Sequence, residues 1–194
     1  MNEFRDEQFW REFLNSSEAV RKHIMTDRMR EAFEIVEMLL QRSGFNFAFE
    51  LTKDEHSAIL VLTPEGDALQ ARRIDDLLAI QPEIPGWSFF GRRQRKSLED
   101  ALTFVRKIYG LDVSDARFQL VSTDFGNEVI VVSNAMLGLS IDESYGLAVT
   151  LLDHALGEDH VMSKVYGVRG AISSDIGSEQ LLTLSQLAIR LGCS

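Results

Sequence analysis

The chain has 194 residues, a length that suits one large domain or one duplicated unit. Hydrophobic residues make up 45% of the sequence, which is enough to build a core and excludes wholesale disorder. The formal net charge is −10, which disfavours nucleic acids and anionic membranes as partners because like charges repel.

The cysteine content and the apolar runs indicate the compartment. The one cysteine, Cys193, cannot form an intramolecular disulfide, and this favours a reducing environment. No apolar run approaches the roughly 20 residues of a transmembrane helix. Residues 1–7 lack the apolar core of a signal peptide. We therefore expect a cytoplasmic protein.

The first predicted element is a helical extension over residues 1–26. Phe9 and Phe13 are four residues apart and lie beside Trp10, so one flank of this helix is aromatic. Residues 15–18 resemble a capping box, which predicts that one helix ends near residue 14 and another begins near Ser16. The aromatic flank either packs on the main domain or offers a binding face to a partner protein.

Two series of elements follow, each with a helix, two strands, a helix and a strand. Helices are indicated by apolar residues at three- and four-residue spacing, and strands by alternating or β-branched runs. The first series covers residues 28–43, 45–51, 58–62, 67–80 and 87–90. The second covers residues 97–109, 117–123, 128–132, 142–156 and 161–168. A last helix is predicted over residues 178–192.

The two series define pseudo-repeats, about 27–91 and 97–169, which share the order α-β-β-α-β but no residue-level identity. Each repeat is small for an independent core. We therefore expect a single compact domain over residues 1–194, with the repeats joined in one continuous mixed sheet or packed as two sheets face to face. The predicted class is α+β, with mixed or antiparallel sheet covered by helices and with flanking N- and C-terminal helices.

A basic run lies between the two repeats. Four cations occupy five positions, Arg92, Arg93, Arg95 and Lys96, in a chain that is otherwise acidic. They suit a pocket for phosphate or carboxylate, or an RNA contact. They equally suit a solvated loop that offsets the acidic surface. Because neither interleaved aromatic residues nor a glycine-rich loop accompanies the run, no nucleic-acid partner is expected.

A second cluster of ionisable residues lies where a predicted helix meets Gly157. His154 and Glu158 are four residues apart, so they share a face if the helix continues. They could orient an imidazole or ligate a metal ion together with His160 or Asp159. The spacing lacks the paired histidines of a helical zinc site. His154 could instead pack near a helix C-terminus, where a partly positive ring is favoured.

Motifs that would name a reaction are missing from the sequence. It contains no Gly-x-Ser-x-Gly elbow, no phosphate-binding loop and no Gly-x-Gly-x-x-Gly. Cys193 is the penultimate residue, where a nucleophile is seldom placed. No cofactor, metal ion or catalytic residue is therefore predicted.

Three segments resemble a group of uncharacterised bacterial proteins. The segments are Phe9-Trp10-Arg11-Glu12-Phe13, Pro82-Glu83-Ile84-Pro85-Gly86-Trp87 and Leu152-Asp153-His154-Ala155-Leu156-Gly157-Glu158. The resemblance implies a bacterial source and places Trp87, His154 and Glu158 at motif positions. It implies no reaction, because the group has no established activity.

These observations lead to three functional hypotheses. The first is a non-enzymatic binding or regulatory module for a small molecule or a protein, with Trp87, the four cations, His154 and Glu158 as binding residues. The second is a hydrolytic or metal-assisted enzyme that uses His154 and Glu158. The third is a protein–protein adaptor that uses the aromatic helix. Exposed apolar helix flanks would also allow a homodimer.

Overall fold

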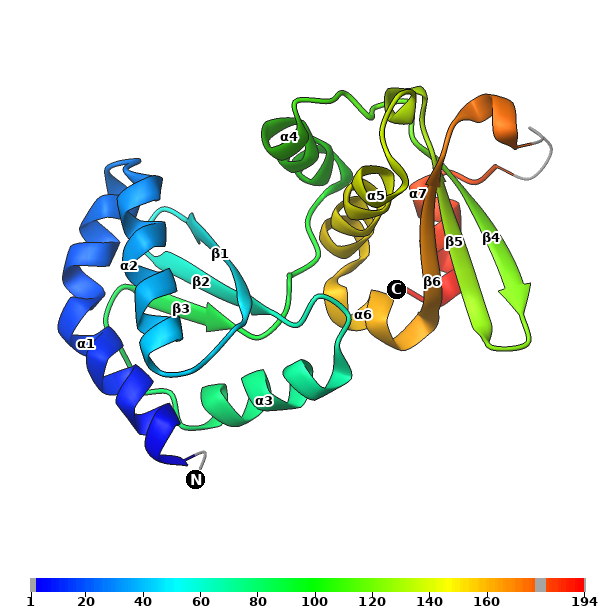
Figure 1. The fold of residues 1–194 in the computed structure, drawn as a ribbon. Coiled ribbons are helices and arrows are strands. Elements are labelled where there is room, and N and C mark those ends of the chain that lie inside the picture. The colour runs from blue at the N-terminus through cyan, green and yellow to red at the C-terminus, as the bar shows by residue number, and fades with distance from the viewer. Residues whose placement is uncertain (1–2, 177–180, 194) are drawn as a thin grey trace. The chain divides into compact units, whose positions relative to one another are not determined.

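The computed structural model describes residues 3–176 and 181–193, and it has the α+β architecture that the sequence predicts. Contacts divide the chain into two compact units, Met1–Arg92 (unit 1) and Arg93–Ser194 (unit 2), each with its own three-stranded sheet (Figure 1). The boundary falls between the two predicted pseudo-repeats. The expectation of a single compact domain over residues 1–194 stays a prediction.

Unit 1 contains three helices and one sheet in its described part. Its elements are α1 (Glu3–Met25), α2 (Met29–Arg42), β1 (Ala48–Lys53), β2 (Ala58–Thr63), α3 (Ala68–Ala79) and β3 (Trp87–Phe90). The strand order is β1-β2-β3, with β1 antiparallel and β3 parallel to the central strand. The sheet is therefore mixed, as a hairpin followed by a helical crossover requires.

α1 is one continuous helix, so the predicted break near Ser16 is wrong. The hydroxyl of Ser16 donates to the Glu12 carbonyl at 3.1 Å, and that of Ser17 donates to the Leu14 carbonyl at 2.9 Å. A serine hydroxyl that donates to a carbonyl of the preceding turn has its hydrogen bond inside the helix, so the helix need not end there. Val20 and Ile24 then continue the buried stripe to the end of the helix.

β1 begins at Ala48, three residues later than predicted. The backbone N–H of Phe45 still bonds the carbonyl of Leu40 at 2.9 Å, which belongs to the end of α2. The rings of Phe45 and Phe47 stack 5.0 Å apart before the strand starts. The first two aromatic residues of the alternating run, Phe45 and Phe47, therefore pack at the end of α2 and do not belong to the strand.

Unit 2 repeats the order of elements with additions. Its elements are α4 (Leu98–Tyr109), β4 (Arg117–Thr123), β5 (Gly126–Val132), the short 3-10 helix η1 (Asn134–Met136), α5 (Ile141–Leu156), α6 (Glu158–Lys164), β6 (Val165–Ala171), a second 3-10 turn η2 (Ser173–Asp175) and α7 (Leu184–Leu191). The strand order is β4-β5-β6, again with one antiparallel and one parallel pair.

The predicted strand over 161–168 is corrected at its first half, which is helical. Gly157, at φ +89°, ends α5, and the chain then enters α6 with Glu158 and Asp159 in the first turn. Acidic residues are favourable at a helix N-terminus, because the backbone N–H groups there carry partial positive charge. The apolar residues at 161 and 162 therefore lie on a helix, and the strand begins at Val165.

The C-terminal helix α7 begins at Leu184, after residues 181–183, which are not helical. Thr183 caps it through a reciprocal capping box with Gln186. Just before the cap, Leu182 pairs with Phe118 of β4 through two backbone hydrogen bonds, of 2.6 and 2.9 Å. The first predicted residues of this helix lie outside the described part of the chain.

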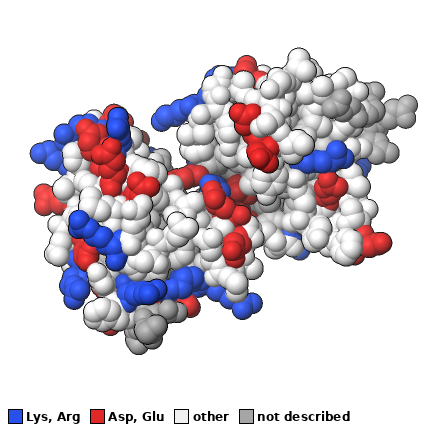
Figure 2. All heavy atoms as spheres, viewed as in Figure 1, with Lys and Arg blue, Asp and Glu red and all other residues white. Residues whose placement is uncertain are grey.

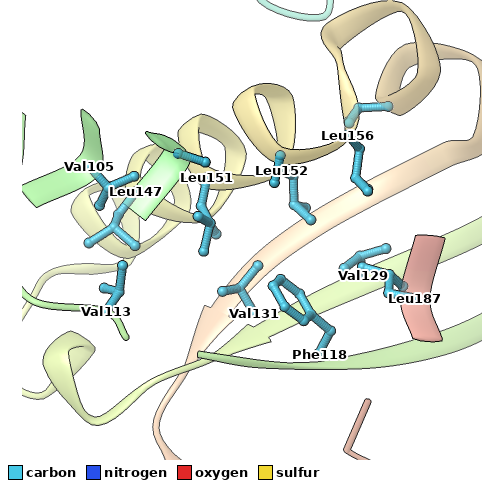
Figure 3. Packing of buried hydrophobic residues seen from close by; sticks show 14 of the residues in the cluster. Val105, Val113, Phe118, Val129, Val131, Leu147, Leu151, Leu152, Leu156 and Leu187 are labelled. Atoms are coloured by element: carbon cyan, nitrogen blue, oxygen red, sulfur yellow. The ribbon is translucent and has the colours of Figure 1, made fainter. Parts of the chain in front are cut away.

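The core of unit 2 is aliphatic and lies between the sheet and α5 (Figure 3). Val129 and Val131 of β5 and Phe118 of β4 face Leu147, Leu151 and Leu152 of α5, and Leu187 of α7 closes one end.

Within the described residues, no helix is long and apolar enough to cross a membrane. Lys and Arg share the visible surface with Asp and Glu (Figure 2).

Candidate functional site

Trp87, one of the predicted binding residues, lies in the core of unit 1. Its indole N–H donates to the Ser17 carbonyl at 3.2 Å, and its ring packs 4.9 Å from Phe13 and 5.7 Å from Phe89. These contacts give the residue a structural role. A binding role for Trp87 stays a prediction.

The two arginines at the unit boundary each bond to carboxylates of their own unit. Arg92, in unit 1, donates to the Asp75 carboxylate at 3.1 Å and to the Gly91 carbonyl. Arg93, in unit 2, places its guanidinium 3.1 Å from an Asp153 oxygen and 3.7 Å from a Glu158 oxygen. The first half of the basic run is thus engaged in ion pairs within the fold.

Glu158 and the backbone of Arg93 are joined in both directions. The Arg93 N–H donates to Glu158 Oε2 at 3.0 Å, and the Glu158 N–H donates to the Arg93 carbonyl at 3.0 Å. Asp153 and Glu158 are almost completely buried, and buried carboxylates are retained only where they are paired and hydrogen-bonded. The arrangement fastens the segment after residue 92 to the junction of α5 and α6.

The second half of the basic run continues along this junction. The Lys96 N–H donates to the His154 carbonyl at 2.7 Å, and the Lys96 ammonium lies 4.4 Å from the centre of the Phe104 ring. That ring is 4.0 Å from the imidazole of His154, which is buried. The backbone of Arg95 lies close to Gly157: a Cβ added to Gly157 would be 3.6 Å from the backbone nitrogen of Arg95. Arg95 itself is exposed.

The proposed metal ligands have different surroundings. His154 packs on Phe104, Glu158 contacts Arg93, and Nε2 of His160 lies 3.2 Å from the Leu191 carbonyl oxygen. Over residues 3–176 and 181–193, no group of three or more His, Cys, Asp or Glu side chains could hold a metal ion. The convergence that a metal site requires is therefore not found there.

The aromatic flank of α1 is buried in unit 1. Phe9, Trp10 and Phe13 all belong to its core, and the Trp10 indole donates to the Leu77 carbonyl at 2.8 Å. Packing on its own unit, one of the two predicted fates of this flank, is therefore confirmed. The adaptor hypothesis loses the surface on which it rested.

A cavity of about 510 Å³ lies in unit 2, and we call it the β6 cavity. Its walls come from three parts of the chain: the loop that begins in η1, the first turns of α5, and the C-terminal half of β6. The lining residues are Met136, Leu137, Gly138, Leu139, Ile141, Asp142, Ser144, Tyr145, Val168, Arg169, Gly170, Ala171 and Ile172.

The β6 cavity is bordered by large exposed apolar side chains. Leu137, Ile141 and Tyr145 are 74%, 88% and 51% exposed, although all three line the same hollow. A cavity along β3 in unit 1 has a similar volume, about 570 Å³, but one continuous segment, residues 81–90, forms all of it. The β6 cavity is therefore the better candidate for a site built by several elements.

The charged side chains that line the β6 cavity are one cation, Arg169, and one carboxylate, Asp142. Arg169 is already paired with Glu128 at 2.9 Å. Asp142 lies in the first turn of α5 with Glu143. The pKa of Glu143 is lowered, first by the backbone N–H of Ser140 and then by its hydroxyl. The Ser140 hydroxyl and the Glu143 carboxylate thus accept from backbone N–H groups at the start of α5.

The sequence analysis did not identify this cavity, although one signal was present. Residues 136–141 read Met-Leu-Gly-Leu-Ser-Ile, which is unusually apolar for a connection between a strand and a helix. Loops run over the surface and are normally polar, so apolar residues there suggest a binding surface.

Comparisons with known proteins gave no match. No protein-family model, no curated protein and no solved structure is significantly similar to this chain.

Proposed function

We propose that this chain is a non-enzymatic binding module of a bacterial cytoplasm, and that it binds its ligand in the β6 cavity. The observation that carries the proposal is the placement of Leu137, Ile141 and Tyr145, which are exposed to water around one hollow. Exposed apolar residues that border a cavity are typical of ligand and protein binding sites.

The size and chemistry of the cavity support this proposal. Sites for small ligands commonly enclose about 300–1,000 Å³ and combine apolar walls with a few polar groups. The β6 cavity, at about 510 Å³, falls within this range. Its polar side chains are few and include Asp142 and Ser144 of α5.

Glu158 and His154, which were candidates for catalysis, make structural contacts in unit 2 and lie outside the β6 cavity. Glu158 is held by the guanidinium and backbone of Arg93, and the His154 ring packs on Phe104. Both residues thus contribute to joining the segment 93–96 to α5 and α6. A second copy of the chain is also a protein ligand, so a homodimer would be one form of this binding.

The test uses an uncharged apolar probe, N-phenyl-1-naphthylamine, whose fluorescence rises in apolar surroundings. We expect binding to the full chain, and the double variant Leu137→Ser, Ile141→Ser should weaken it about tenfold or more, because two apolar contacts are lost. The matched control is Ile189→Ser, Phe125→Ser, which removes two side chains of similar exposure, 76% and 77%, outside the cavity.

Equal probe affinity in the two double variants would contradict the assignment of the site. Turnover of a substrate that is lost in His154→Gln but retained in the Leu137→Ser, Ile141→Ser variant would contradict the non-enzymatic role.

A further inference from the structure

The wall of the β6 cavity is an edge strand whose outer hydrogen-bonding groups have no partner among the described residues. β6 is the last strand in the order β4-β5-β6. The Ala171 carbonyl accepts from Ser133 N–H at 3.0 Å, on the side of β5. Since successive residues of a strand direct their N–H and C=O groups to opposite sides, Val168, Gly170 and Ile172 direct theirs away from β5.

The other edge of this sheet is partly covered. Leu182 bonds to Phe118 of β4 through both of its backbone groups, so an incoming strand would meet a paired segment there. β6 has no such cover within residues 3–176 and 181–193. An uncovered edge is a template for another extended chain.

The open edge and the exposed apolar residues belong to the same cavity. Residues 168–172 line one wall, and Leu137, Ile141 and Tyr145 are among the residues that line the others. At about 3.3 Å per residue, residues 168–172 span roughly 13 Å, which matches an extended segment of four or five residues. Alternate side chains of such a segment would lie against the apolar wall.

The charges of the cavity define the occupant further. Arg169 is neutralised by Glu128, whereas Asp142 lines the cavity and has no ion-pair partner in the described part of the chain. Glu143 lies outside the lining, with its carboxylate bonded to Ser140, and adds a second negative charge in the same turn of α5. The rim is therefore complementary to Lys or Arg and repels an acidic segment.

From the open edge, the apolar wall and the acidic rim, we infer that the β6 cavity binds an extended peptide segment in which apolar residues alternate and Lys or Arg lies beside them. The segment adds to β6 as a fourth strand, with main-chain bonds to residues 168, 170 and 172. This inference rests on the proposed function and names the class of ligand.

The experiment selects peptides from a random displayed heptapeptide library on the full chain. We expect enrichment of segments with alternating apolar residues and at least one Lys or Arg. A synthetic copy of the best segment should bind at least tenfold more weakly to the Leu137→Ser, Ile141→Ser variant than to the Ile189→Ser, Phe125→Ser control. Asp142→Asn should weaken binding about two- to fivefold, as expected for an exposed ion pair.

Main-chain pairing is tested by N-methylating each peptide bond of the synthetic segment in turn. Addition to a strand predicts a periodic result: methylation of every second amide abolishes binding, and methylation of the others has little effect. An equal loss at every position, enrichment of acidic peptides, or no enrichment would overturn the inference.

Two further outcomes separate this inference from the proposed function. Binding of N-phenyl-1-naphthylamine in the cavity without enrichment of any peptide would overturn the peptide inference alone. A dimer in solution that Leu137→Ser, Ile141→Ser dissociates would identify a second copy as the occupant and would also overturn it. Failure of both the probe and the peptides to bind would remove the proposed site altogether.

Discussion

The two units arrange the same order of elements around different kinds of side chain. Residues 29–90 and residues 98–171 both follow the order helix, strand, strand, helix, strand, with α6 added in the second. In both sheets the first two strands are antiparallel and the third is parallel to the central one. The similarity is one of topology.

The cores of the two units differ in composition. Unit 1 packs rings against one another: Phe13 lies within 5.9 Å of the rings of Phe9, Trp10, Trp87 and Phe89. The core of unit 2 consists mainly of Leu, Val and Ala, with one phenylalanine, Phe118, among its fully buried members. The order of elements therefore does not dictate the class of core residue, which only has to fill the volume.

Each unit also uses a helix from outside its repeat. α1, before the first repeat, supplies Phe9, Trp10 and Phe13 to the core of unit 1. α7, after the second repeat, supplies Leu187, Ala188 and Leu191 to the core of unit 2. A repeat of this size buries too little apolar surface by itself, and a flanking helix adds the missing part. The flanking helices are thus parts of the two cores.

The largest expected effect tests the aromatic core of unit 1. Phe13→Ala should lower the free energy of unfolding by about 4 kcal/mol, because it empties a fully buried site. Phe13→Leu, which supplies the type of residue found in unit 2, should cost only about 1.5 kcal/mol. Urea unfolding followed by tryptophan fluorescence reports this, since both tryptophans, Trp10 and Trp87, lie in unit 1.

Phe4→Ala provides the control for this comparison. Phe4 lies on the same helix but is 69% exposed, so its removal should change the free energy of unfolding by less than about 0.5 kcal/mol. If Phe13→Leu were as destabilising as Phe13→Ala, the contacts between rings would matter more than the volume they fill.

The buried ion pairs offer a second comparison between the units. In unit 2 one guanidinium, Arg93, contacts two carboxylates, whereas in unit 1 the Arg73 guanidinium bonds to one carboxylate, that of Asp6. Glu158→Ala should cost about 3 kcal/mol, because it leaves a buried N–H and a buried cation poorly compensated. Glu158→Gln retains an acceptor for the Arg93 N–H and should cost about half as much.

Thermal unfolding of the two Glu158 variants measures this difference. Asp159→Ala is the control, since Asp159 is the next residue in the same helical turn but is exposed. Equal costs for Glu158→Ala and Glu158→Gln would show that the charge of Glu158, and not its hydrogen bond to the backbone, stabilises the junction.

A third comparison concerns a glycine at the third strand of each unit. A Cβ on Gly170 would lie 2.6 Å from Met136 Sδ and 2.8 Å from the backbone oxygen of Ser144. A Cβ on Gly91 would lie 3.0 Å from methyl groups of Ile74 and Leu78, which can move aside more easily. Gly170→Ala should therefore cost about 2 kcal/mol and Gly91→Ala less than about 1 kcal/mol.

Thermal unfolding of the two alanine variants checks the order of these costs. Gly170→Ala should also weaken N-phenyl-1-naphthylamine binding, because Gly170 lines the β6 cavity beside α5. A neutral Gly170→Ala would mean that α5 is less closely packed on β6 than the structure indicates.

The order of elements could be predicted from the sequence because it depends on local patterns. Helix 97–109 was expected from apolar spacing and from Gly110, and α4 spans Leu98–Tyr109 with Gly110 as a left-handed C-cap. The strand at 128–132 was expected from its β-branched run and is the central strand β5. Errors occurred where a local pattern is ambiguous, as at 161–164, which fits a strand or a helix.

The partners of the candidate site residues could not be predicted in the same way. Arg93 finds Asp153 and Glu158 at separations of 60 and 65 residues, and no local spacing encodes such a contact. The walls of the β6 cavity likewise come from two segments about 30 residues apart, which meet only because β6 returns parallel to β5. Contacts between residues far apart in the sequence therefore determine both the ion pairs of Arg93 and the position of the β6 cavity.

The smallest effect is expected at the N-terminal caps of the two crossover helices, α3 and α5. In unit 1 Asp67 caps α3 alone, whereas in unit 2 Ser140 and Glu143 cap α5 reciprocally, which lowers the pKa of Glu143. Because its folded pKa is below its unfolded value, Glu143 stabilises the fold above the unfolded pKa, and this contribution is lost as the pH falls through the folded pKa.

A carboxyl-detected NMR titration should place the pKa of Glu143 below the ordinary glutamate range. Ser140→Ala should raise it, while Ser144→Ala, one turn further along α5, should leave it unchanged. A Glu143 that titrates normally would mean that α5 begins without the reciprocal cap, and that the acidic rim of the β6 cavity is less firmly held.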